Sequence, residues 1–175
     1  MGRLPVGTVD CPGPAREKQS RAFSGQRGMR EQRSVSDHEA ALRAVERGWN
    51  AAARDWNPAG LAALYTEDAV FYGGRPGHSV GRQQVSAYFE SYVGMFTHVG
   101  LALIDQELRA LGDDVCLAQG YARFSIDLAA GGTTTAVLRS TLVLVRRPEG
   151  WLIAQHHFSA TPDTVPIPLP DAKQA

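Results

Sequence analysis

The sequence lacks most features that mark a cofactor-dependent or membrane-bound protein. Its 175 residues contain two cysteines, Cys11 and Cys116, and no cysteine–histidine cluster with the spacing of a metal site. No glycine pattern of the dinucleotide-binding or phosphate-loop type is present, so we expect no cofactor and no metal. No apolar run approaches the length of a membrane span, and no apolar signal segment opens the chain. These absences predict a soluble, cytoplasmic protein without a membrane partner.

An excess of one charge is also missing, because 18 Lys and Arg balance 18 Asp and Glu. Residues 1–35 contain seven basic and three acidic residues, whereas residues 36–163 contain ten and fourteen. A mildly acidic domain offers no electrostatic footprint for nucleic acid, so we expect no nucleic-acid partner. Residues 1–35 are poor in large apolar side chains, which predicts a disordered basic tail, with Met29 as an alternative start. We expect one domain over 36–163 and a C-terminal tail over 164–175.

Hydrophobic periodicity predicts three helices followed by long strands. A first helix is expected over about 37–55, a second begins at Asn57-Pro58, and a third covers about 82–94. A short strand is expected at 69–72. Four longer antiparallel strands follow, at 97–111, 115–128, 135–147 and 151–160. This order predicts an α+β fold, in which three N-terminal helices cover a strongly bent antiparallel sheet. The open end of such a cone is a natural pocket.

The last two strands are expected to form a hairpin at the centre of the sheet. Residues 147–150, Arg-Pro-Glu-Gly, have turn chemistry and separate two runs rich in β-branched and aromatic residues. Long apolar runs are typical of central strands. Polar side chains interrupt these runs at Arg139, Ser140, Thr141, Gln155, His156, His157 and Ser159. A core strand has little reason to hold so many hydrogen-bonding groups unless a pocket or an interface uses them.

Three motifs within residues 37–162 resemble the nuclear-transport-factor-2-like superfamily, which includes the SnoaL-like polyketide cyclases. They are Trp49 through Glu67-Asp68-Ala69-Val70, then Val80-Gly81 with Tyr88-Phe89-Glu90, and lastly Trp151-Leu152-Ile153 with His156-His157-Phe158-Ser159 and Pro162. The last motif resembles a bacterial SnoaL-like subgroup. Residues 111–125, LGDDVCLAQGYARFS, resemble the association domain of calmodulin-dependent kinase II. The resemblance implies a cystatin-like, nuclear-transport-factor-2-like cone.

The resemblance implies a small-molecule-binding domain whose apolar pocket holds a hydrophobic ligand, either anionic or polyketide-like. No complete catalytic set of the superfamily maps onto the chain. The alternative is a cofactor-independent acid–base enzyme of the isomerase, cyclase or lyase type, or a biosynthetic accessory protein. The strands from 115 to 160 carry apolar residues on both faces, which predicts a homodimer through the sheet.

The kinase-domain resemblance places Arg123 on the inner face of its strand. It would share this face with Tyr121, Ser125, Ser140, His156, Phe158 and Asp105. Arg123 then either binds an anionic ligand or forms an ion pair with Asp105. In the enzyme alternative, Arg123, His156 and Asp105 are the candidates for catalysis. A register error of one residue in either hairpin would exchange the two faces.

The remaining candidates come from the cone that the resemblance implies. The expected ligand contacts are Trp49, Tyr65, Tyr88, Tyr92, Tyr121, Ser140 and Phe158. The adjacent His156 and His157 point to opposite faces of a strand, so they cannot chelate one metal ion together. For the histidine that faces the cavity, a hydrogen-bonded structural role is favoured over a general base.

Overall fold

The computed structural model describes residues 36–163, so the predictions for both tails lie outside the described residues. The first helix covers residues 36–53 and buries Leu42, Val45 and Trp49 along one side. The short helix α2 (Pro58–Ala62) follows, capped by the Asn57 side chain, which accepts a hydrogen bond from the Gly60 backbone at 3.0 Å. The third helix, α3 (Arg82–Glu90), ends earlier than predicted. All three predicted helices are therefore confirmed.

Six strands form one sheet in the order β2-β1-β6-β5-β4-β3. They are β1 (Tyr65–Tyr72), β2 (Ser79–Val80), β3 (Phe96–Gly112), β4 (Val115–Leu128), β5 (Thr133–Arg147) and β6 (Gly150–Ala160). The four long antiparallel strands are confirmed, and the β5–β6 hairpin does lie at the centre of the sheet. The sheet is mixed rather than wholly antiparallel, because β1 runs parallel to β6. The two-residue strand β2 was not predicted.

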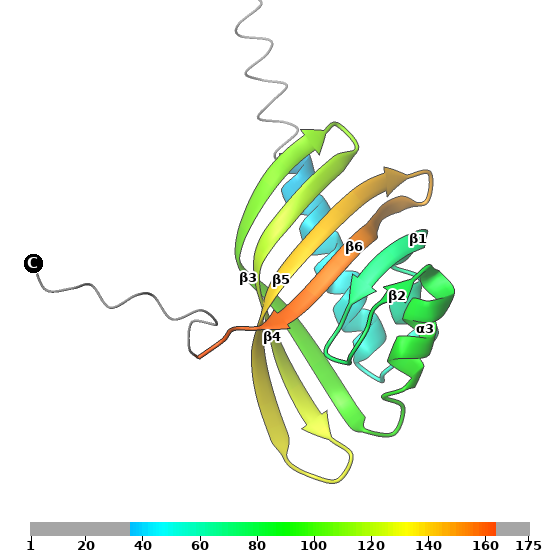
Figure 1. The fold of residues 1–175 in the computed structure, drawn as a ribbon, viewed down its shortest axis with the longest axis vertical. Helices are drawn as coiled ribbons and strands as arrows, with labels where there is room; N and C mark the ends of the chain where they lie inside the picture. The colour runs from blue at the N-terminus through cyan, green and yellow to red at the C-terminus, as the bar shows by residue number, and fades with distance from the viewer. Residues whose placement is uncertain (1–35, 164–175) are drawn as a thin grey trace, which may run out of the picture. The chain divides into compact units, whose positions relative to one another are not determined.

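The first helix lies across one face of the curved sheet, and α3 lies beside β1 and β2 (Figure 1). The buried apolar side chains of the helices and of this concave face form one continuous core. The opposite, convex face of the sheet is covered by no helix in the described part of the chain (Figure 1). The domain is thus an α+β fold with a strongly curved sheet around a single core.

Polar side chains of the first helix complete the free edge of β3. The Asn50 side chain donates to the Leu101 carbonyl at 2.8 Å and accepts from the Leu101 N–H at 2.7 Å. The Glu46 carboxylate accepts from the Leu103 N–H at 2.7 Å, and Arg43 donates to the Leu103 carbonyl at 3.2 Å. An uncovered edge strand would leave these backbone groups unpaired. The helix is therefore tied to the sheet at the level of the cavity described below.

A bulge in β3 bends the sheet between Ile104 and Glu107. Asp105 within it has a φ of 51°, in the left-handed region that non-glycine residues rarely adopt. Gly120 of β4 faces the bulge, and a Cβ atom there would lie 2.4 Å from the Asp105 carbonyl oxygen. Only a glycine lets the two strands approach so closely. The bulge therefore depends on the residue at position 120.

Candidate functional site: an aromatic cavity

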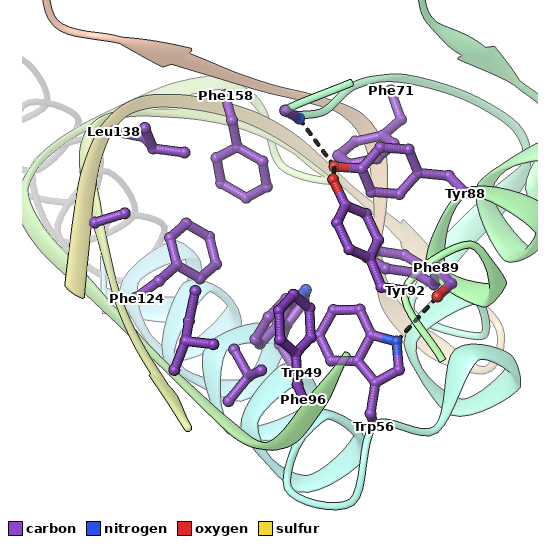
Figure 2. Close-up of a pocket in the computed structure, with 14 residues that line it drawn as sticks. Trp49, Trp56, Phe71, Tyr88, Phe89, Tyr92, Phe96, Phe124, Leu138 and Phe158 are labelled. Carbon is purple, nitrogen blue, oxygen red and sulfur yellow. Dashed lines mark hydrogen bonds between the residues drawn. The ribbon is translucent and has the colours of Figure 1, made fainter. Parts of the chain in front are cut away.

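The concave face of the sheet and the helices line an open cavity of about 160 Å³. Fourteen residues line it, and nine of them are aromatic (Figure 2). The lining residues are Trp49, Trp56, Phe71, Gly74, Tyr88, Phe89, Tyr92, Phe96, Val99, Phe124, Ile126, Ala136, Leu138 and Phe158. None of them carries a charge. The cavity therefore suits an apolar guest, since apolar surface gains by leaving water for such an environment.

Strand alternation decides which sheet residues reach the cavity. Phe124 of β4 pairs directly with Ala136 of β5, and both face inward. Ala122 pairs with Leu138 on the same face, and Phe158 of β6 comes from the neighbouring strand. The Phe124 and Phe158 rings meet edge to face at 5.2 Å between centroids. The sheet thus supplies one wall of packed rings and small aliphatic groups.

Trp56 reaches the cavity from the end of the first helix. Its φ of 45° is left-handed, and the backbone bonds Trp56 N to Ala53 O (3.2 Å) and Asn57 N to Ala52 O (2.8 Å) form a Schellman-type helix end. Glycine usually occupies this position, because a side chain there strains the backbone. The Trp56 indole N–H donates to the Phe89 carbonyl at 2.9 Å, which fixes the ring against the cavity (Figure 2).

Two hydroxyl groups at the cavity lie where α3 meets residues 73–78, the glycine-containing loop between β1 and β2. The Tyr88 hydroxyl accepts a hydrogen bond from the Gly74 N–H at 2.9 Å, and it shares a second one with the Tyr92 hydroxyl at 3.3 Å. Figure 2 shows these two hydroxyl groups side by side at one end of the cavity. The Arg75 guanidinium lies over the Tyr92 ring, 4.2 Å from its centroid, and donates to the Ser91 carbonyl. Burial raises the pKa of Tyr88, so this hydroxyl keeps its proton.

A buried histidine lies behind the cavity wall rather than in it. His156 shares a 2.9 Å hydrogen bond between its Nδ1 atom and the Tyr65 hydroxyl, and its Nε2 atom has no hydrogen-bond partner among residues 36–163. The rings of Phe71 and Phe158, which line the cavity, pack against its imidazole. Burial, reinforced by the neighbouring His157, lowers the pKa of His156 to about 3, so the imidazole is neutral.

Four of the predicted ligand contacts, Trp49, Tyr88, Tyr92 and Phe158, line the cavity. Tyr65 and Ser140 are on the predicted inner side and are buried, but they lie outside the lining. His156 also lies on the inner side, and His157 is exposed on the outer side, so the predicted opposition of the two histidines is confirmed.

The prediction that Arg123 and Tyr121 face the pocket is wrong. Both are exposed on the convex face, because Arg123 pairs with Val137 and not with an inward-facing residue of β5. Arg123 would share a face with Ser140 only if the β4–β5 register were shifted by an odd number of residues, so the observed register puts the two side chains on opposite faces. Asp105 is exposed in the β3 bulge and does not line the cavity. No ion pair joins Arg123 to Asp105 within residues 36–163.

The sequence interpretation missed Trp56, Phe71, Phe96 and Phe124 as lining residues. The signal for Phe124 was present, since it alternates with the polar residues of β4 together with Ala122 and Ile126. No three His, Cys, Asp or Glu side chains of the described chain come together as a metal site would require. Within the same residues no helix has both the length and the apolar character to cross a bilayer.

Comparison with known proteins identifies the family. Residues 42–164 match the family model of the SnoaL-like domain. No curated protein sequence matches the chain. A solved Xanthomonas campestris structure, described as a calcium/calmodulin dependent protein kinase II association domain, is 30% identical with a TM-score of 0.64. The match covers 73% of this chain and 88% of that one.

Two further structures share the fold at lower identity. A nuclear transport factor 2-like superfamily protein from Salmonella enterica is 19% identical, with a TM-score of 0.63 over 77% of this chain and 99% of that one. A protein from Novosphingobium aromaticivorans described as a scytalone dehydratase is 12% identical, with a TM-score of 0.64 over 82% and 99%. Proteins with a cystatin-like fold match as well, which confirms the predicted fold class. The chain therefore belongs to the SnoaL-like domain family.

Proposed function

We propose that this domain binds a small apolar ring compound in the aromatic cavity without transforming it. The observation that carries this proposal is the lining itself, with nine aromatic and no charged side chains. Aromatic walls favour a flat guest, which can make stacked or edge-to-face contacts with several rings. Burying the guest contributes about 25 cal/mol for each Å² of apolar surface removed from water.

The size of the cavity limits the guest. A dry, apolar cavity of roughly 150 Å³ is large enough for a benzene ring. The cavity of about 160 Å³ therefore suits a guest of one or two fused rings. A larger polyketide with several fused rings would not fit wholly within this volume. Among the hydrophobic compounds that the sequence predicts as ligands, we therefore propose a small one.

The position of the titratable groups supports binding over acid–base catalysis. Efficient general acids and bases touch the reacting molecule and have pKa values near the working pH. His156 is separated from the cavity by Phe71 and Phe158, and its pKa of about 3 is far from neutrality. Arg123 and Asp105 lie outside the cavity altogether. Members of the superfamily include both binding proteins and enzymes, so the alternative needs its own test.

Titration calorimetry with indane, a two-ring hydrocarbon, tests the binding proposal. We expect wild-type protein to bind indane with 1:1 stoichiometry. Ala136→Leu places a larger aliphatic side chain inside the cavity and should weaken binding at least tenfold. Ala51→Leu, on the exposed side of the first helix, serves as the control and should bind like wild type. Absence of indane binding, or equal binding by the Ala136→Leu variant, would refute the proposal.

Deuterium exchange tests the enzyme alternative directly. 1-Indanone has an acidic C–H group next to its carbonyl, and an acid–base enzyme of the isomerase type would remove that proton. We expect the protein to leave the exchange rate in D₂O unchanged while it binds the ketone, as followed by proton NMR. Faster exchange that is lost in the Ala136→Leu variant would favour the enzyme alternative.

We also propose that a second copy of the chain covers the convex face of the sheet. Tyr72, Tyr121 and Val137 are exposed there, and no described helix covers them. Arg123 and Glu107 bring both signs of charge to this face, as a surface that pairs with itself through a twofold axis requires. Partly apolar sheet faces of this kind are typical of protein interfaces.

A further inference from the structure

We propose that the Tyr88–Tyr92 pair is a specificity-determining donor that binds one oxygen atom of the ligand. The ligand class is then a one- or two-ring compound with a carbonyl or other acceptor oxygen on the ring edge. This inference rests on the proposed function, since it assigns a polar contact within the same cavity. It follows from the number of protons that the two hydroxyl groups carry.

Two hydroxyl groups bring two protons, and only one of them is used between the pair. The Gly74 N–H donates to the Tyr88 oxygen, so that contact uses neither hydroxyl proton. The 3.3 Å contact between Tyr88 and Tyr92 uses one proton, whichever residue donates it. No other acceptor for either hydroxyl occurs among the described residues. One O–H group of the pair is therefore left to donate outside the protein.

The position of the pair directs this donor to a ligand. Both tyrosines line the cavity, and their hydroxyl groups lie at the same end of it (Figure 2). The lining also contains two indole N–H donors: that of Trp56 is already bonded to Phe89, and that of Trp49 is buried without a hydrogen-bond partner among the described residues. An acceptor oxygen placed against the remaining aliphatic and aromatic side chains would lose its water without a replacement, which is costly. Of the two unused donors, we assign the ligand oxygen to the tyrosine pair, because its hydroxyl groups are held in place and strengthened by their surroundings.

The surroundings hold the donor in place and strengthen it. A Cβ atom at Gly73 would lie 2.3 Å from the Tyr88 ring, so a glycine is needed for the loop to pack there. The bond from Gly74 and the bond to Tyr92 fix the Tyr88 hydroxyl from two sides. The Arg75 guanidinium over the Tyr92 ring draws electron density from it, which strengthens the hydroxyl as a donor. Because hydrogen bonds in a chain polarise one another, the last O–H is the stronger donor.

The affinities of indane and 1-indanone, measured by calorimetry in three proteins, test this inference. The two compounds share a ring skeleton and differ in the carbonyl oxygen. We expect wild type to bind 1-indanone about 2- to 10-fold more tightly than indane, the range of one neutral hydrogen bond. The Tyr88→Phe/Tyr92→Phe double variant keeps both rings, so indane affinity should stay within about twofold and the preference for the ketone should vanish. Tyr72→Phe, outside the cavity, should behave as wild type.

The outcomes separate this inference from the proposed function. If wild type binds neither compound, the proposed function fails and the inference falls with it. If indane binds but wild type shows no preference for 1-indanone, the inference alone is wrong. A preference that survives in the folded double variant also overturns it, because the donor is then elsewhere. If the double variant does not fold, the ratio of the two affinities in wild type decides, together with a Tyr92→Phe variant. This variant frees the Tyr88 proton, so it should keep the preference for 1-indanone over indane.

Discussion

Trp56 illustrates how a single residue is constrained by the cavity. Its left-handed backbone would cost less with glycine, yet the indole ring fills part of the lining and bonds to the Phe89 carbonyl. Strained residues persist where the surroundings determine their conformation and often cluster at functional sites. The sequence predicted a first helix to about residue 55 and gave no sign that Trp56 lines the cavity, because periodicity alone does not show that the helix ends at residue 53.

The buried His156 makes stability dependent on pH. Its folded pKa of about 3 lies below the ordinary 6.5, so the unfolded chain takes up a proton first as pH falls. The stabilising contribution is complete above pH 6.5 and is lost on acidification toward pH 3. The loss approaches about 1.4 kcal/mol per pH unit. Between pH 7.5 and 5.0 we expect wild type to lose about 2 kcal/mol more stability than His156→Gln in urea unfolding.

Wild type and His156→Gln contain the same carboxylates. The contribution of the carboxylates to the pH dependence of stability therefore cancels when the two proteins are compared. His98→Gln, an exposed position on β3, is the matched control and should keep the wild-type slope. Equal slopes for wild type and His156→Gln would show that His156 is accessible to protons in the folded state. That result would contradict the buried, structural role described here.

For single residues, the sequence predicted which side chains share a face of a strand, but not which of the two faces points into the cavity. Alternation correctly grouped Tyr121 with Arg123 and set them against Ala122 and Phe124. Which group faces inward depends on the register of the β4–β5 pairing, and the residues of the loop between the strands do not determine it. The prediction that Arg123 faces inward rested on the kinase-domain resemblance and not on the burial of apolar side chains. The alternation of Ala122, Phe124 and Ile126 would have pointed to the opposite face.

Among the elements, β3 and β4 depend on each other at the bulge. Gly120→Ala would place a methyl group 2.4 Å from the Asp105 carbonyl oxygen and 2.6 Å from Gln106 Nε2. The backbone would have to shift, which typically costs about 1–3 kcal/mol. We expect Gly120→Ala to lower the free energy of unfolding in urea by that amount. Gly112→Ala, which would meet no atom within 4 Å, should be neutral. Equal stability of the two variants would contradict the close approach of these strands.

Helices and long strands were predictable because their side chains repeat over many residues. The first helix and β3 to β6 carry apolar periodicity over eleven residues or more, so their type and order were found correctly. Strand β1 was predicted too short, because exposed Glu67 and Asp68 interrupt its apolar pattern. Its parallel pairing with β6 joins segments about 85 residues apart, and local sequence carries no signal for such a contact.

For the whole molecule, the cavity depends on side chains from almost every element. Trp49 comes from the first helix, Phe71 from β1, Phe89 from α3, Phe96 from β3 and Phe158 from β6. The sequence predicted a pocket from the fold class, since a cone closed by helices has a hollow end. It could not predict the lining, because that depends on how far the rings reach between elements.

The convex face predicts the state of assembly. We expect sedimentation velocity to show a dimer of wild-type protein at micromolar concentration, and Val137→Glu to shift it to monomer by burying an unpaired charge. Leu111→Glu, at a more exposed position near the β3–β4 turn, is the control and should remain dimeric. A monomeric wild type, or a dimer that Val137→Glu does not affect, would contradict assembly through this face.

Methyl NMR during a titration with indane tests the central claim most directly, because it locates the guest. Ala136, Leu138, Val99 and Ile126 line the cavity and carry methyl groups, whereas Val137 lies on the opposite face of the same strand as Ala136. Binding inside the aromatic cavity should shift the four cavity signals strongly through the ring currents of the guest and leave Val137 unchanged. Shifts concentrated at Val137, or no shifts at all at saturating indane, would contradict the account.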